Sequence, residues 1–99
     1  METLDVEHVA PRLREIEAAA EALAGRVVTT PVVALASDRI RRHLPPESLV
    51  AIKLELFQHA GSFKSRAALL HIDGLDAEAR RRGVTAVSAG NHALAVSWA

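Results

Sequence analysis

The sequence predicts an α/β fold in which parallel strands are joined by crossover helices. Residues 49–56 alternate between two faces, one of them apolar, and residues 84–88 form a second apolar segment rich in β-branched side chains. Each segment is followed by a glycine-containing loop, residues 57–62 and 89–91, and then by apolar residues at helical spacing. Strands and helices in this order form parallel sheets with right-handed connections. Both loops would therefore leave the same edge of the sheet, where open α/β proteins bind ligands.

The composition fits a small globular domain and argues against several classes of protein. Of the 99 residues, 49% are hydrophobic and 24% charged, with 12 basic and 12 acidic side chains and no cysteine. This balance predicts no binding to nucleic acid or membranes, and no apolar run approaches the ~20 residues needed to cross a bilayer. The five histidines lack the spacing of metal ligands. The start lacks a basic region followed by an apolar run, so a cytoplasmic location is expected.

A helix and an edge strand are expected in the N-terminal part of the chain. Apolar residues recur at helical spacing over residues 9–24, where Pro11 suits the first turn and Gly25 lies just past the end. Residues 26–35 are rich in β-branched side chains but contain Pro31, which cannot donate to a sheet ladder. This segment is therefore predicted to be an edge strand or an extended segment.

Four further helices are expected beyond Pro31. Ser37 can cap a short helix over residues 37–44, and Asp76 can start another that runs to Arg82. Ser62 can cap the helix after the first loop, which ends at Asp73-Gly74. The side chains expected to point inward from that helix are Phe63, Ala67, Leu70, His71 and Ile72. Asn91 opens the last helix.

Lys64 is the candidate reactive residue. The chain has ten arginines but only two lysines, and Lys64 falls in the first turn of a predicted helix. Exposed amides there carry roughly half a positive charge, which favours the neutral amine that carbonyl chemistry requires. Gly90 turns the second loop so that backbone amides can receive a carboxylate or phosphate. By themselves, these positions also fit a solvated lysine and a purely structural turn.

Two motifs closely resemble the serine/threonine dehydratase branch of the fold-type II pyridoxal-phosphate enzymes. The matching residues are Lys53-Leu54-Glu55, Gln58, Gly61-Ser62-Phe63-Lys64-Ser65-Arg66-Ala67 and Ser88-Ala89-Gly90-Asn91-His92-Ala93. The resemblance implies a three-layer αβα catalytic domain of the tryptophan synthase beta-like type, of which residues 1–99 are an incomplete N-terminal fragment. It also implies pyridoxal 5'-phosphate as cofactor, a small-molecule amino-acid substrate and a homo-oligomeric full-length protein.

The resemblance assigns a role to each matched site residue. Lys64 would form a Schiff base with the cofactor and then act as the base at the substrate Cα, with Phe63 packed beside the cofactor. Asn91 would hydrogen-bond the phenolic oxygen of the pyridine ring. The cofactor-binding residues are thus Phe63, Lys64 and Asn91. The residues implied to hold the substrate are Ser88, Gly90, Asn91 and His92.

The implied activity is that of a lyase, which removes the β-hydroxyl of serine or threonine to give a 2-oxo acid and ammonia. Ala89 stands where the family's serine racemases carry a second serine as base, so chemistry on one face is favoured. The alternatives are another fold-type II enzyme, such as a serine racemase or threonine synthase, or an inactive remnant or interaction module. The family's phosphate cradle follows later in the sequence, so residues 1–99 alone are expected to be inactive.

Overall fold

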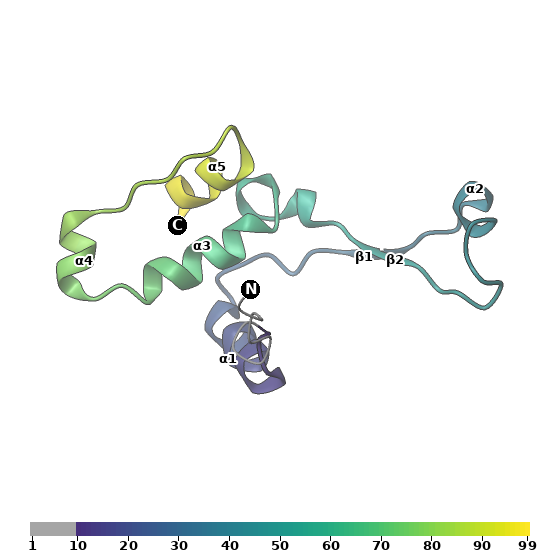
Figure 1. Ribbon diagram of the computed structural model, residues 1–99, viewed down its shortest axis with the longest axis horizontal. Helices are drawn as coiled ribbons and strands as arrows, with labels where there is room; N and C mark the ends of the chain where they lie inside the picture. Colours follow the sequence, from purple (N-terminus) through teal and green to yellow (C-terminus); the bar gives the residue numbers. More distant parts are fainter. Residues whose placement is uncertain (1–9) are drawn as a thin grey trace, which may run out of the picture.

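The computed structural model describes residues 10–99, which form two helical parts joined by a narrow β-ribbon (Figure 1). The elements are α1 (Leu13–Leu23), β1 (Val32–Ala34), α2 (Asp38–Arg41), β2 (Ala51–Lys53), α3 (Lys64–Asp73), α4 (Ala77–Arg82) and α5 (Asn91–Trp98). Helices α1, α3 and α5 gather on one side, and α2 lies at the far end of the ribbon (Figure 1). None of the helices in the described part is long and apolar enough to cross a membrane.

Helices α3 and α5 pack closely because small side chains lie on their buried faces. Ser65 and Ala95 are completely buried, and Ala68 and Leu69 are nearly so. Residues 65, 68 and 69 follow the spacing of one helical face. The prediction that Phe63, Ala67 and His71 point inward is wrong: all three are exposed, while Leu70 and Ile72 are half-buried. The buried side of α3 is thus rotated from the predicted one.

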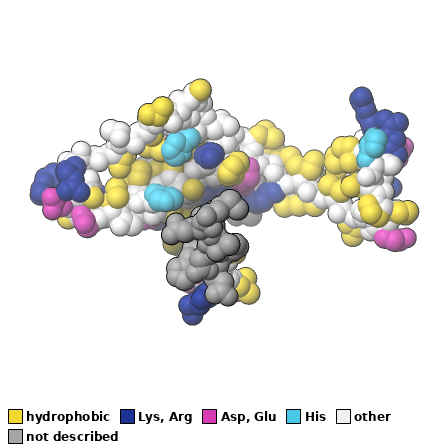
Figure 2. All heavy atoms as spheres, in the orientation of Figure 1, with side chains coloured by type: hydrophobic (Ala, Val, Ile, Leu, Met, Phe, Trp, Pro, Cys, Tyr) yellow, Lys and Arg dark blue, Asp and Glu magenta, His cyan; other side chains and the backbone are white. Residues whose placement is uncertain are grey.

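The ribbon consists of β1 and β2, which pair antiparallel with Val33 opposite Ile52. All six strand residues are exposed, and apolar side chains are visible along the ribbon in Figure 2. The predicted edge strand is confirmed for Val32–Ala34, directly after Pro31. The strand predicted over residues 49–56 is limited to Ala51–Lys53 and gives way to a short 3₁₀ turn, Glu55–Phe57.

The second predicted strand, residues 84–88, does not form in this structure. Strand formation needs a ladder partner, but this segment lies over α3, where Val84, Thr85 and Ala86 line a cavity with residues of that helix. The side chain of Val87 is fully exposed. The predicted parallel pair with residues 49–56 is therefore absent from the described residues, whose one sheet is antiparallel.

Most helix ends lie where local sequence signals place them. Asp76 caps α4 by accepting a hydrogen bond from the Ala79 amide at 2.8 Å, and Gly83 ends it with φ +80°. Gly25 follows α1 with φ +73°, as expected. Two boundaries were wrong. Helix α1 begins at Leu13, beyond Pro11, and α2 ends at Arg41, three residues before the predicted end. Residue 9 lies outside the described part.

Candidate active site

The loop before α3 is held in place by a buried glutamine. Gln58 is 4% exposed and bonds both backbone groups of Val28: its side-chain oxygen accepts from the Val28 amide and its side-chain nitrogen donates to the Val28 carbonyl, each at 2.9 Å. The same oxygen accepts from the amide of His59 at 3.1 Å. An amide side chain with both ends paired is rigid. It fixes the loop to the segment that leads into β1.

The start of α3 is built by two serines and a left-handed turn. Ala60 and Gly61 have φ values of +58° and +73°, which reverse the chain after Gln58. The hydroxyl of Ser65 donates to the carbonyl of His59. The hydroxyl of Ser62 accepts from the amide of Lys64 at 3.4 Å, although the capping position itself is occupied by Phe63. Lys64 thereby becomes the first residue of the helix.

Lys64 lines a cavity of about 230 Å³ between α3, α5 and the segment that precedes α5. The residues contributed by α3 are Lys64, Ala67, Ala68, His71 and Ile72, which share one helical face. Val84, Thr85 and Ala86 form a second wall, and His92 and Val96 of α5 form the third. The walls are mainly apolar, with basic side chains on α3 and α5. Lys64 and His92, predicted from separate motifs, therefore meet at one cavity.

The two lysines of the chain differ in their partners. The amine of Lys53 donates to the carbonyl of Thr30 at 3.2 Å and lies 3.8 Å from Glu55. The amine of Lys64 has no ion pair or hydrogen bond with the described residues, and it lies 5.5 Å from the centre of the Phe63 ring. Imine formation requires an amine whose lone pair is available. Lys64 therefore fits an aldehyde cofactor better than Lys53 does.

A charged network lies beside the Lys64 helix. Arg66 forms two hydrogen bonds with the carboxylate of Glu55, at 2.9 and 2.8 Å. The hydroxyl of Thr30, which is 3% exposed, donates to the same carboxylate at 2.6 Å. The hydrogen bonds from Arg66, and secondarily the one from Thr30, lower the pKa of Glu55 from 4.5 to about 2. This carboxylate is an anchor that stays ionised, rather than an acid that donates a proton.

Three other predicted site residues, Ser88, Gly90 and Asn91, lie at the exposed start of α5. Asn91 is its first residue, and Gly90 donates a hydrogen bond from its amide to the hydroxyl of Ser88 at 3.1 Å. None of these three residues lines the cavity that Lys64 and His92 share. Phe63 is 61% exposed, with its ring near the Lys64 amine. Their proposed contacts with cofactor and substrate stay predictions.

Sequence reasoning assigned no site role to His71, which also lines the cavity. Its Nδ1 atom lies 2.8 Å from the carbonyl of Ala67. The signal was available, because residues 64 and 71 are seven apart and share a helical face. Glu55, Gln58 and Arg66 belong to the recognised motif, but their mutual contacts are visible only in the structure.

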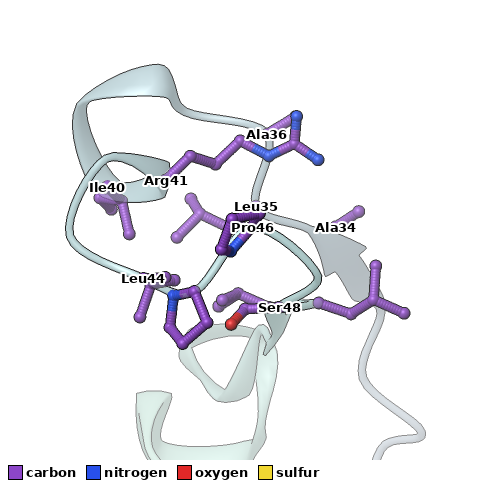
Figure 3. A pocket seen from close by; sticks show the side chains of 11 residues that line it. Ala34, Leu35, Ala36, Ile40, Arg41, Leu44, Pro46 and Ser48 are labelled. Atoms are coloured by element: carbon purple, nitrogen blue, oxygen red, sulfur yellow. The ribbon is translucent and has the colours of Figure 1, made fainter.

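A larger cavity, of about 320 Å³, lies between α2 and the ends of the ribbon strands (Figure 3). Leu35, Ile40 and Leu44 point into it, and the side chain of Arg41 crosses its edge (Figure 3). It is at the opposite end of the ribbon from α3 and α5 (Figure 1). None of the residues implied for cofactor or substrate binding lines this cavity.

Comparison with known proteins identifies the family. Residues 23–99 match the family described as pyridoxal-phosphate dependent enzyme. The chain is 45% identical over 73 residues to the phenylserine dehydratase of Ralstonia pickettii, covering 74% of this chain and 21% of that protein. It is 38% identical over 85 residues to the catabolic L-threonine dehydratase TdcB of Escherichia coli, covering 84% and 24%.

A solved structure extends the comparison to the fold. Maize serine racemase matches with a TM-score of 0.70 and 38% sequence identity, covering 89% of this chain and 26% of that one. This chain therefore belongs to the pyridoxal-phosphate dependent enzyme family, and the predicted fold-type II class and cofactor are confirmed. The chain spans about a quarter of the length of the relatives that it matches.

Proposed function

We propose that Lys64 is the cofactor-bearing and proton-transferring lysine of a serine/threonine dehydratase. The observation that carries this proposal is the Lys64 amine, which has no partner among residues 10–99 and lines a cavity that it shares with His92. Membership of a pyridoxal-phosphate dependent family supplies the need for such an amine. The full protein would act in the cytoplasm on a small β-hydroxy amino acid and assemble as a homo-oligomer.

The residues of this chain have distinct tasks in the proposed reaction. Pyridoxal phosphate, when bound, supplies an electron sink for the bonds at the substrate Cα. Lys64 would hold the cofactor and then take the Cα proton from the face of the substrate that is turned toward it. Phe63 covers one side of the cofactor and Asn91 bonds its phenolic oxygen. The amides and side chains of residues 88–92 hold the substrate carboxylate at the start of a helix, where an anion is favoured.

Dehydration is favoured over racemisation by a single side chain. Racemisation needs a second group that exchanges a proton on the opposite face of Cα, whereas elimination needs only the first base and acid assistance to the hydroxyl. Ala89 offers no proton-transferring group at the position where this family's racemases carry serine. The proposal therefore assigns one-face chemistry to this site, despite the similarity to maize serine racemase.

The test measures 2-oxo acid release by the whole gene product with L-serine, L-threonine and L-phenylserine. We expect turnover of at least one of these three amino acids. In Lys64→Ala, kcat should fall about 10⁴-fold or more, because the side chain that holds the cofactor and acts as the base is removed. Lys53→Arg keeps the cation beside Glu55 and serves as the control. Racemisation without 2-oxo acid release would contradict the assigned reaction, and activity retained in Lys64→Ala would contradict the assigned lysine.

A further inference from the structure

We propose that the ion pair between Glu55 and Arg66 positions Lys64, by setting the rotation of α3 so that the amine faces the cavity. Arg66 is then a positioning residue that acts through Lys64, and Glu55 is its anchor. This inference rests on the proposed function, since it concerns the same amine. It gives a structural role to Glu55 and Arg66, two motif residues that have no part in the proposed reaction.

The geometry of α3 carries the first step. Successive helical residues are about 100° apart around the axis, so Lys64 and Arg66 are about 200° apart and project from nearly opposite sides. Arg66 lines a hollow with Lys53 and residues of the 20–29 segment. Lys64 lines the cavity with α5 and residues 84–86. Fixing the Arg66 side of the helix therefore fixes the direction of Lys64.

The contacts of Arg66 are suited to fixing a direction. A planar guanidinium with two parallel hydrogen bonds to one carboxylate permits little rotation, unlike a single-point ion pair. Glu55 is itself held: Thr30 donates to it at 2.6 Å, and it lies in a 3₁₀ turn directly after β2. The anchor is therefore part of the scaffold rather than a free surface side chain.

A second ion pair in the chain provides the contrast. Glu78 and Arg82 are paired at 2.7 Å on α4, with side chains 66% and 67% exposed, and both partners belong to one helix. Such a pair cannot orient one element relative to another. Glu55 and Arg66 are 16% and 31% exposed and join different elements. Matched substitutions in the two pairs therefore separate positioning from a general effect of lost charge.

The experiment labels the whole gene product with pyridoxal 5'-phosphate, reduces the product with borohydride and quantifies Lys64 and Lys53 by peptide mass spectrometry. The variants are Glu55→Gln and Arg66→Gln, with Glu78→Gln and Arg82→Gln as controls. Trp98, the single tryptophan of residues 1–99, stacks on His59 with ring centres 4.6 Å apart, so its emission reports whether α5 remains docked. Energy transfer from Trp98 to the pyridoxyl group at Lys64 reports where the amine points.

We expect wild type to label Lys64 in preference to Lys53. Where Trp98 emission is unchanged from wild type, Lys64 should be labelled about tenfold less in Glu55→Gln and Arg66→Gln, since a small misplacement of a reactive group lowers its rate by this factor or more. Energy transfer from Trp98 to the label at Lys64 should also be weaker in both variants. The α4 variants should match wild type. Unchanged labelling of Lys64 and unchanged energy transfer in Glu55→Gln and Arg66→Gln would overturn the inference. Loss of the Trp98 docking signal in both variants would also overturn it, because the ion pair would then act in folding alone. No Lys64 preference in wild type would instead contradict the proposed function.

Discussion

The starts of α3 and α5 carry the residues proposed for chemistry, but their surroundings differ. Around the start of α3, the side chains of Gln58, Ser62 and Ser65 all bond backbone groups, and each is buried. Before α5, the described contacts include one such bond, from the Gly90 amide to Ser88, and residues 81–90 are all exposed. The two loops resemble each other in sequence pattern, as strand, glycine turn and helix, yet one is anchored and the other is not.

This difference separates the two parts of the proposed site: contacts within residues 10–99 hold the start of α3 in place, but not the start of α5. The direction of Lys64 follows from contacts among residues 28–30, 55–59 and 65–66, all within this part of the chain. The position of Asn91 has no comparable anchor there. Substitutions near α3 should therefore alter stability strongly, while equivalent substitutions near α5 should alter it little.

The largest effect is expected for Gln58→Ala. It leaves both backbone groups of Val28 without their partner and removes the bond to the His59 amide, in a site that is 4% exposed. These are three part-buried hydrogen bonds, each worth about 1 kcal/mol, so we expect the free energy of unfolding to fall by about 3 kcal/mol. Denaturant titration checks this.

The control for Gln58→Ala is Asn91→Ala at the start of α5. Asn91 is exposed and makes no side-chain hydrogen bond with the described residues. Its replacement should change the free energy of unfolding by about 0.5 kcal/mol or less. Equal losses in the two variants would remove the distinction between the anchored loop and the exposed one.

The second-largest effect is expected for acid: the ion pair between Glu55 and Arg66 of α3 should make the free energy of unfolding depend on pH. Its pKa falls from 4.5 to about 2, chiefly through hydrogen bonds from Arg66, so the folded state binds this proton less readily than the unfolded state. The stabilisation is present above pH 4.5 and is lost as the pH falls toward 2. After allowance for partial exposure, we expect about 2 kcal/mol to be lost over this window.

Acid titration of the free energy of unfolding tests the role of Glu55. Glu55→Gln should be less stable at neutral pH and should show a shallower decline between pH 4.5 and 2, the remainder including Asp73, whose pKa is lowered by the hydrogen bond from Arg26. Glu78→Gln, which alters an exposed pair on α4, should keep the wild-type profile. A Glu55→Gln profile parallel to that of wild type would show that other carboxylates cause the decline.

Local signals explain which elements were predictable from the sequence. The ends of α3 and α4 follow from Gly74, Asp76 and Gly83, whose effects act within a few residues. Residues 84–88 have a strand-like pattern, but a strand also needs a ladder partner from elsewhere in the chain. The pattern alone could not show that this segment lies over α3.

The candidate site, too, could be predicted from the sequence only in part. The motif drew attention to Lys64 and His92, which line one cavity, although no residue of the two loops, 57–62 and 89–91, lines it. The buried face of α3 was mispredicted because apolarity suggested Phe63 and Ala67, whereas Ser65 is the side chain that is fully buried, bonded to His59. A hydroxyl with a backbone partner can occupy a core position that its polarity would not suggest.

The smallest effects compare two serines with similar local bonds. Ser62 accepts from the amide of Lys64 and is 7% exposed, whereas Ser88 accepts from the amide of Gly90 and is exposed. Ser62→Ala should lower the free energy of unfolding by about 1 kcal/mol, since the amide of Lys64 loses its acceptor at the start of the helix. In Ser88→Ala water replaces the hydroxyl, so the change should stay below about 0.3 kcal/mol. Thermal unfolding of both variants provides the comparison, and a larger loss for Ser88→Ala would place the anchored loop before α5 instead of before α3.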